Sequence, residues 1–453
     1  MSLHDDETIA GLSAALARGE TTSVALTERC LERIAAHDRS LNAFITVTAE
    51  RALAAAAAAD RAGANGAATS ALHGIPIALK DLIDEAGVRT TAGSRVRHDV
   101  MASADAPVTA RLRAAGAVLI GKTNLHEFAF GSTGEDSAFG PVRHPDDPAR
   151  LAGGSSGGSA VAVATGMAVA SIGTDTGGSV RIPAALCGVV GLKPEWGAIP
   201  ADGVVPLSRQ LDHVGPLTRT VTDAWLVHET LAGRAPARGA MLTARPLAGL
   251  RIGRLTGYFA ERIDPEVADV YDDALARLQS AGAVVTPLAI AHANDVGPVY
   301  LHLVLGDAAA YHAATLDARP GDYTSAVRLR LEMGRYVQAQ DYARALLGRE
   351  VIARDIDQAL TRCDVLACPT LPIAAPRLGT ATVGTGPDAE PVRAALLRLT
   401  QPFNLGRQPA LTVPCGRTAS AALPVGLQLI GARGQTSGLL AAGLSVERAL
   451  AWR

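Results

Sequence analysis

The sequence predicts an α/β protein: one large domain whose twisted, mixed and mostly parallel sheet is covered by helices on both sides. Segments with helical periodicity alternate with short apolar segments along most of the chain. Apolar residues make up 48% of the 453 residues and charged residues 19%, which is enough for a large core. No Pro/Ser-rich linker divides the chain. We therefore expect a single domain over residues 1–453.

The N-terminal segment, residues 1–65, is predicted to be helical. Apolar residues recur at helical spacing in 6–18 and 24–37, and 48–62 contains an unbroken alanine run. Residues 74–80 then form a short apolar segment, typical of a buried strand that ends at Lys80.

A helix followed by a strand is predicted twice. Asp105 is the expected N-cap of a helix that stops at Gly116, and the apolar strand 117–120 follows. Residues 264–285 repeat this arrangement. Further strands are expected at 250–257, 410–414 and 425–430.

Three subdivisions of the domain follow from these patterns. The N-terminal helical segment precedes residues 74–230, which hold most of the candidate functional motifs. Residues 290–400 are expected to be variable and to shape a substrate site. Loops rich in Ala, Gly, Pro and Thr are expected at 231–248 and 374–392.

Charge and cysteine content narrow the function. The net charge is −2 with no run of like charge, which argues against nucleic acid or membrane partners and favours a small ligand. The chain start lacks the charge and apolar pattern of a secretory signal, so we expect a soluble, cytoplasmic protein. The five cysteines are expected to be reduced thiols. Cys363 and Cys368 have no histidine nearby, which favours structural cysteines over a zinc site.

Lysine is rare in this chain. Of the 42 Lys and Arg residues, only Lys80, Lys122 and Lys193 are lysines. A lysine in so arginine-rich a chain indicates a position that needs a compact amine able to lose its proton, with chance as the alternative.

Two short motif matches do not fit their surroundings. Residues 116–123 match the phosphate-binding pattern G-x-x-x-x-G-K-[ST], but a predicted helix precedes them and a strand lies between the glycines. Residues 153–157 match the nucleophile elbow G-x-S-x-G, but a turn-rich loop precedes them where a strand is required. Neither nucleotide binding nor an α/β-hydrolase elbow is therefore expected.

Two glycine-serine clusters, 153–159 and 173–181, carry the most chemistry. An apolar helix of small residues separates them. Dense glycine lets successive backbone N–H groups point at an anion. With Ser179, the second cluster is typical of a hydroxyl nucleophile with its own oxyanion site, as acyl transfer requires. The alternative is a pair of tight turns with serine caps.

These clusters belong to a series of motifs that resembles the amidase signature enzymes. The resemblance covers nearly the whole chain and rests on 74–81, 121–124, 153–159, 173–183 with Cys187, 191–194, 212–216, 401–404 and 423–428. It implies a Ser-Ser-Lys triad with Ser179 as nucleophile, Ser155 on a cis peptide bond as the bridge and Lys80 as base. A desolvated lysine can be neutral and accept a proton, whereas arginine cannot. Ser155 would relay the proton from Ser179 to Lys80 and return it to the leaving amine.

The resemblance also implies roles for the residues around the triad. The oxyanion would be held by the N–H groups of Thr176, Gly177, Gly178 and Ser179. Asp175 and Arg181 would brace this loop, with a surface ion pair as the alternative. Lys122, Lys193 and His213 are interpreted as structural.

The leading hypothesis for function is a stand-alone amidase. It would cleave a small carboxamide to carboxylate and ammonia through an acyl-enzyme, without metal or cofactor. Phe128, Ala129 and Gly131 align with the family's acyl-pocket wall and predict a partly apolar pocket. The expected ligand is a small-molecule amide. The one protein partner considered is a second copy of the same chain, in a homodimer. The acyl group and the leaving amine do not follow from the sequence.

The alternative is the glutamine-hydrolysing A subunit of a tRNA-dependent amidotransferase, which works in a complex. Residues 124–132 resemble that protein's pocket segment, but His126 replaces the usual acidic residue and Phe130 the usual methionine. Arg330 matches its substrate-carboxylate arginine, in altered surroundings. The residues after Lys193-Pro194 also depart from the family at Glu195-Trp196 and Ala198. A third hypothesis, an inactive binding homologue, is disfavoured by the intact triad residues.

Overall fold

The structure is a computed structural model that describes residues 7–66, 69–384 and 386–452. Its strands are β1 (Phe44–Val47), β2 (Pro76–Lys80), β3 (Val118–Thr123), β4 (Ala170–Asp175), β5 (Val190–Lys193), β6 (His213–Thr218), β7 (Arg251–Leu255), β8 (Val284–Leu288), β9 (Val365–Pro369), β10 (Thr382–Val383), β11 (Glu390–Pro391), β12 (Ala410–Arg417) and β13 (Pro424–Ile430).

The α-helices, in chain order, are α1 (Ile9–Arg18), α2 (Ser23–Leu41), α3 (Ala49–Ala64), α4 (Pro107–Ala114), α5 (Gly157–Ala164), α6 (Arg181–Cys187), α7 (Val221–Leu231), α8 (Pro265–Ser280), α9 (Val296–Ala318), α10 (Ser325–Gly334), α11 (Ala339–Leu360), α12 (Val392–Arg398), α13 (Pro402–Leu405) and α14 (Thr436–Leu450).

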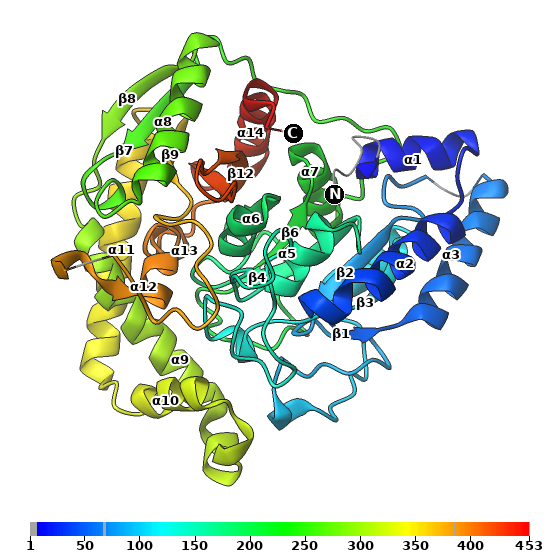
Figure 1. Cartoon of the computed structure of the whole chain (residues 1–453), viewed down its shortest axis with the longest axis horizontal. Helices are drawn as coiled ribbons and strands as arrows, with labels where there is room; N and C mark the ends of the chain where they lie inside the picture. Colours follow the sequence, from blue (N-terminus) through cyan, green and yellow to red (C-terminus); the bar gives the residue numbers. More distant parts are fainter. Residues whose placement is uncertain (1–6, 67–68, 385, 453) are drawn as a thin grey trace.

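A single 11-stranded sheet runs through the molecule in the order β1-β3-β2-β4-β6-β5-β12-β13-β9-β7-β8 (Figure 1). Parallel pairing joins β3-β2-β4 and, at the other end, β9-β7-β8. Every other pairing in this sheet, among the described residues, is antiparallel. The predicted mixed sheet in one domain is thus confirmed. Its antiparallel middle is larger than the sequence predicts, because β6 and β12 run against the strands on both of their sides.

Helices cover both faces of this sheet, as the side-chain alternation of its central strands shows. In β5, Leu192 packs into the core beneath α7, α8 and α14, whereas Gly191 faces Ala184 of α6. In β13, Leu427 packs into the same core beneath α7, α8 and α14, and Gly426 faces Ala185 of α6. Since successive strand residues point to opposite faces, α6 lies across the sheet from α7, α8 and α14. Both glycine-serine clusters lie on the α6 side.

Two local predictions are wrong. The 1–65 segment is not entirely helical, because the four-residue edge strand β1 interrupts it and pairs with β3. Asp105 is not an N-cap. Its carboxylate accepts hydrogen bonds from the Ala86 N–H and the Arg113 guanidinium, and Ala106 takes the N-cap position without a side-chain bond. Residue 6 of the predicted 6–18 helix and residue 385 of the 374–392 loop lie outside the described residues.

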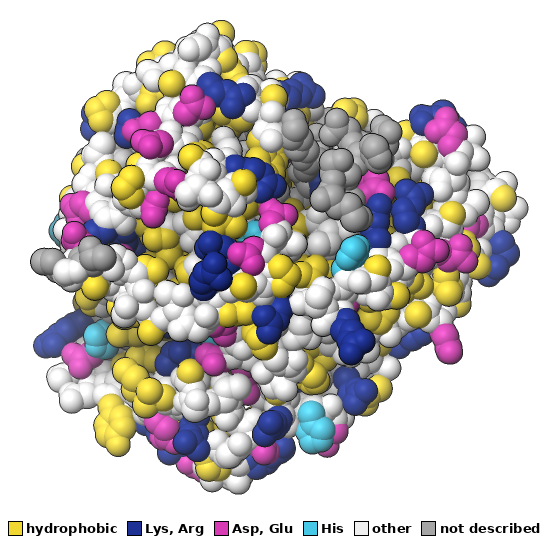
Figure 2. All heavy atoms as spheres, viewed as in Figure 1, with side chains coloured by type: hydrophobic (Ala, Val, Ile, Leu, Met, Phe, Trp, Pro, Cys, Tyr) yellow, Lys and Arg dark blue, Asp and Glu magenta, His cyan; other side chains and the backbone are white. Residues whose placement is uncertain are grey.

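The segment 290–400 is dominated by α9, α10 and α11, as Figure 1 shows in yellow-green and yellow. α12, the last helix of the segment, returns toward the central sheet and packs near the glycine-serine loops. On the face shown in Figure 2, basic and acidic side chains are interspersed and form no patch of a single sign. No helix within the described ranges is long and apolar enough to cross a membrane.

Candidate active site

Lys80 occupies the last position of β2 and is completely buried. Its Nζ donates hydrogen bonds to Ser155 Oγ and to Thr174 Oγ1, both at 2.7 Å. Burial lowers the pKa of Lys80 to about 7, although the charges of Asp175 and Asp212 act in the opposite direction. A large fraction of this amine is therefore neutral near pH 7 and able to accept a proton.

Ser155 lies two residues before the start of α5, and its Gly154–Ser155 peptide bond is cis, as the resemblance implies. Its carbonyl accepts a hydrogen bond from the His126 N–H at 3.2 Å. Gly154 has no space for a Cβ, because the Gly134 N–H would lie 2.8 Å from it. These contacts fix the Ser155 hydroxyl at the tip of Lys80.

Ser179 lies between β4 and α6, in the second glycine-serine cluster. It is 4% exposed, and its carbonyl accepts a hydrogen bond from the Ser156 N–H at 3.1 Å, which joins the two clusters. In the described chain, no hydrogen bond links the Ser179 hydroxyl to Ser155 or to Lys80. The structure thus joins Lys80 to Ser155 directly and ties the Ser179 backbone to Ser156, the neighbour of Ser155.

The backbone of residues 176–179 turns sharply at Gly178, whose φ is 140°. A Cβ on Gly178 would also collide with the Thr400 side chain, so this position requires glycine. None of the N–H groups of residues 176 to 179 donates to an acceptor elsewhere in the described ranges. A row of free donors beside a serine is the arrangement that can stabilise a tetrahedral oxyanion.

Asp175 and Arg181 stabilise this loop through a buried ion pair. Both are fully buried, and two hydrogen bonds of 2.9 and 3.0 Å join the guanidinium to the carboxylate. Arg181 also donates to the Thr400 carbonyl, Gln428 and Asn404. Burial alone would raise the pKa of Asp175, but the charges of Arg181 and Lys193 hold it far below its usual value. The alternative of a surface ion pair is therefore wrong.

Two residues of this site, Thr174 and Asp212, were not identified from the sequence. Thr174 supplies the second acceptor for Lys80, and the Asp212 carboxylate accepts a 2.6 Å hydrogen bond from Thr176 Oγ1. The N–H groups of Leu207 and Ser208 also donate to Asp212, and desolvation raises its pKa to about 6. Asp212 lies in the 212–216 motif, which was the one signal that could have identified it.

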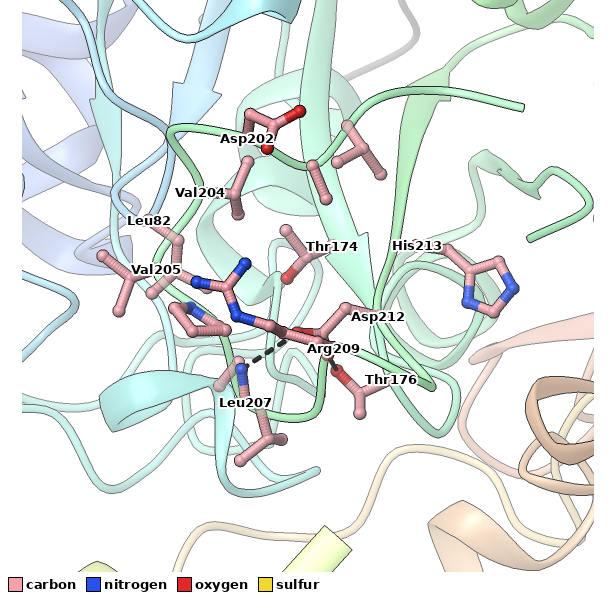
Figure 3. Close-up of a pocket in the computed structure, with 14 residues that line it drawn as sticks. Leu82, Thr174, Thr176, Asp202, Val204, Val205, Leu207, Arg209, Asp212 and His213 are labelled. Carbon is pink, nitrogen blue, oxygen red and sulfur yellow. Dashed lines mark hydrogen bonds between the residues drawn. The ribbon is translucent and has the colours of Figure 1, made fainter. Parts of the chain in front are cut away.

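A cavity of about 110 Å³ opens beside the end of β4 and is lined by Thr174, Thr176 and Asp212 (Figure 3). Arg209 extends across it toward Leu82 and Val205 (Figure 3). Because Thr174 is a direct partner of Lys80, a ligand in this cavity would approach the candidate base.

The four residues expected to bind substrate are not all at this cavity. Ala129 lines it. Phe128 is buried against His312, with ring centroids 4.3 Å apart, and a Cβ on Gly131 would collide with the His126 ring. Arg330 Nη2 lies 3.2 Å from His126 Nε2. Gly131 and Arg330 thus form a second group around the His126 ring. The backbone N–H of His126 donates to the Ser155 carbonyl.

Lys122, Lys193 and His213 make the contacts expected of structural residues. Lys122 Nζ lies 3.0 Å from an Asp81 carboxylate oxygen, and Lys193 Nζ donates to the Gln408 carbonyl at 2.6 Å. His213 Nδ1 is 2.7 Å from the Leu211 carbonyl, and its ring points away from the cavity (Figure 3). All five cysteines are buried free thiols. No group of three or more His, Cys, Asp or Glu residues in the described segments could hold a metal ion.

The whole chain is similar to proteins of known family and known structure. A family model described as Amidase matches residues 25–440. The glutamyl-tRNA(Gln) amidotransferase A subunit of Roseiflexus sp. (strain RS-1) is 40% identical over 487 aligned residues, covering 100% of this chain and 98% of that protein. A crystal structure described as an amidase is 38% identical with a TM-score of 0.91, covering 97% of this chain and 99% of the other. The structure of the same type of A subunit from Thermotoga maritima is 32% identical with a TM-score of 0.77, covering 94% and 91%.

Proposed function

Because this chain belongs to the amidase family and is an amidohydrolase acting on amide C–N bonds, we propose that it is a stand-alone amidase of small carboxamides. The observation that carries the proposal is the 2.7 Å hydrogen bond between the buried Lys80 amine and the Ser155 hydroxyl, in a segment whose next residue, Ser156, binds the Ser179 backbone. Neutral lysine is a competent general base, and a pKa near 7 matches it to neutral pH.

The proposed mechanism moves one proton along the triad. The Ser179 hydroxyl oxygen attacks the amide carbon as its proton passes to Ser155, while the Ser155 proton passes to Lys80. The N–H groups of residues 176–179 stabilise the negative oxygen of the tetrahedral intermediate. Return of the proton through Ser155 to the leaving nitrogen releases ammonia and forms the acyl-enzyme. Water then attacks the ester by the same proton route and releases the carboxylate.

A partner-free enzyme is favoured by the structural likeness. The TM-score is 0.91 to the amidase structure and 0.77 to the amidotransferase protein from Thermotoga maritima. His126 and Phe130 also depart from the usual pocket residues of that type of protein. The second candidate function is glutamine hydrolysis as the A subunit of an amidotransferase, favoured by the 40% identity to the Roseiflexus protein over nearly its whole length.

The proposal also covers the domain organisation of the chain and the place where the enzyme acts. The single domain carries the triad within residues 74–230, and residues 290–400 shape the substrate site. The enzyme acts in the cytoplasm on a small-molecule amide, needs no cofactor and requires no second type of subunit, so that a homodimer is the one assembly compatible with the proposal.

Ammonia release by the purified chain tests the proposal. The substrates are aliphatic, aryl and amino-acid amides including glutamine, each with wild type, Ser179→Ala and Lys80→Ala. Ser280→Ala, which changes an exposed serine of α8, is the matched control and should retain full activity. We expect turnover of at least one simple amide that both triad substitutions abolish. Silence on the whole panel, or glutamine cleavage only with added partner proteins, would favour the role in an amidotransferase complex.

A further inference from the structure

The proposed mechanism turns Lys80 into a cation inside the protein. Its side chain is completely buried, and its two hydrogen-bond partners, Ser155 and Thr174, present neutral hydroxyl oxygens. An ammonium group held only by neutral oxygens in a poorly solvated place is unfavourable unless a negative charge lies nearby. An anion close to this amine would therefore favour every step in which Lys80 holds the proton.

Two carboxylates are placed to supply that charge. Asp175 and Asp212 both act on the Lys80 amine against the effect of burial, Asp175 more strongly. Asp175 is shared with Arg181, however, whose guanidinium lies 2.9 Å from it. No lysine, arginine or histidine nitrogen within the described ranges lies within 4.0 Å of the Asp212 carboxylate, whose partners are a hydroxyl and two backbone N–H groups. Of the two carboxylates, Asp212 is thus the one without a cation of its own.

The position of Asp212 follows from the pairing of two central strands. β4 and β6 are neighbouring antiparallel strands, and their register continues so as to place Asp212 across from Thr176. The carboxylate accepts a 2.6 Å hydrogen bond from Thr176 Oγ1 and lines the same cavity as Thr174 (Figure 3). Because Thr174 binds the Lys80 amine directly, this cavity brings the carboxylate into the surroundings of the candidate base.

The Asp212 carboxylate is held in place by its own loop. The N–H groups of Leu207 and Ser208 donate to its Oδ2 at 3.0 and 3.1 Å. The Ser208 hydroxyl in turn donates to the Asp307 carboxylate of α9 at 2.5 Å, which anchors the loop to that helix. With a pKa of about 6, Asp212 is ionised at neutral pH. It therefore presents a negative charge at a fixed place in the site.

Other titratable side chains lie around Asp212 and Lys80, namely Asp81, Asp202, Arg209, His213, Tyr300 and Asp307. Asp202 and Arg209 are exposed, so solvent screens their charges. Burial keeps His213 and Tyr300 uncharged at neutral pH, because it lowers the pKa of the first and raises that of the second. Asp81 is paired with Lys122, and Ser208 lies between Asp307 and Asp212 and binds both. Among the described charges, those of Asp175 and Asp212 are the ones that act on Lys80.

We propose that Asp212 is a positioning residue of the amidase reaction, whose negative charge stabilises the Lys80 ammonium that forms when the amine accepts the proton. The inference rests on the proposed amidase function and adds Asp212 to its machinery. The proton passes from Ser179 to Ser155 and from Ser155 to Lys80, which leaves an ammonium near a carboxylate. Its return through Ser155 to the leaving nitrogen restores the neutral amine, and Asp212 itself exchanges no proton. Through Thr176 the same carboxylate holds the start of the candidate oxyanion loop.

Asp212→Asn tests the charge, because asparagine keeps an oxygen acceptor for Thr176 and removes the negative charge. We expect kcat on the pH plateau to fall about 10–100-fold and KM to stay within about threefold. The midpoint of the acid limb of kcat/KM should move down by about one pH unit, since loss of a negative charge lowers the pKa of Lys80. Asp212→Glu restores the charge and should return the midpoint close to its wild-type value. Asp269→Asn, which removes the same charge from an exposed position of α8, is the matched control and should change none of these values.

The small number of lysines allows the amine itself to be titrated. Protein labelled with carbon-13 at the lysine ε-carbon gives signals from Lys80, Lys122 and Lys193 alone, and Lys80→Met identifies the signal of Lys80. In the Ser179→Ala background, nuclear magnetic resonance should show a Lys80 midpoint near pH 7 that Asp212→Asn lowers by about one pH unit. Thermal melts verify that the variants are folded.

The two measurements separate this inference from the proposed function. A Lys80 midpoint that Asp212→Asn leaves unmoved, or a plateau kcat within about twofold of wild type, would overturn the inference while the amidase function stands. A midpoint that moves in a protein without turnover of any amide would instead overturn the proposed stand-alone function and retain the link between Asp212 and Lys80.

Discussion

The ends of β2 and β3 each hold a fully buried lysine, yet the two lysines have opposite surroundings. Lys80 of β2 is bound by two neutral hydroxyls, those of Ser155 and Thr174. Lys122 of β3 lies 3.0 Å from the buried carboxylate of Asp81 and donates to a carbonyl at 3.1 Å. The strands are adjacent and parallel, with Leu79 opposite Lys122.

In the proposed mechanism, this difference separates a buried lysine that acts as base from one that does not. A nearby carboxylate stabilises the ammonium form, whereas hydroxyls can also serve the neutral amine by donating their own protons to it. Burial lowers the pKa of Lys80, as proton transfer needs, and no carboxylate contacts the amine to offset this, whereas Lys122 is the counter-ion of Asp81. The following predictions test this assignment.

The largest effect is expected at Lys80. Lys80→Met and Lys80→Arg should both lower kcat by at least about 10³-fold, because neither side chain can accept the Ser155 proton near neutral pH. The assay is ammonia release from a reference amide between pH 7 and 9, with circular dichroism to verify folding. An active Lys80→Arg enzyme would contradict the role of Lys80 as base.

The matching substitution at Lys122 should affect stability. Lys122→Met leaves the Asp81 carboxylate buried without its counter-ion, and we expect a loss of about 3–5 kcal/mol in the free energy of unfolding. Denaturant unfolding measures this loss. The double variant with Asp81→Asn should recover part of it, and kcat of the folded fraction should stay within a few-fold of wild type. A stable but inactive Lys122→Met protein would contradict the assignment of Lys122 to stability and of Lys80 to catalysis.

The pH profile should follow the Lys80 amine. Since only the neutral amine accepts a proton and its pKa is about 7, kcat/KM should fall about tenfold per unit below pH 7 and level off above it. Asp212, with a pKa of about 6, becomes protonated at lower pH and should steepen the decline there. Initial rates from pH 5 to 9 test both limbs. A flat profile over this range would be incompatible with Lys80 as base.

The smallest effect is expected at Thr174. Thr174→Val removes one of the two hydroxyls bound to Lys80 and should lower kcat by about threefold to tenfold. Ser171→Ala is the matched control on β4, because the Ser171 hydroxyl donates to the Ala78 carbonyl and not to the lysine. Equal rates for Thr174→Val and wild type would show that Ser155 alone positions the amine.

Much of the site could be predicted because its signals are local in sequence. Lys80 follows a short apolar strand, and both glycine-serine clusters are continuous segments. The sheet was predictable to the extent that helices and apolar strands alternate. β1 was not, because four residues at a sheet edge carry too little pattern between two helices.

Residues that act through long-range contacts escaped prediction. Thr174 meets Lys80 across 94 positions, and Asp212 meets Thr176 across 36. Asp105 looked like a helix cap, but tertiary contacts with Ala86 and Arg113 use its carboxylate instead.

The partners of Arg181 have a consequence for the order in which the enzyme is made. Thr400, Asn404 and Gln428 lie 219 to 247 positions further along the chain, and β12 completes the middle of the sheet next to β5. A ribosome that has synthesised residues 74–230 has therefore made all three residues of the proposed triad, but not the groups that bind Arg181 and hold its loop. Under the proposed mechanism, a nascent chain carries all three triad side chains before the C-terminal strands that complete the site, and we expect hydrolysis only after those strands have emerged.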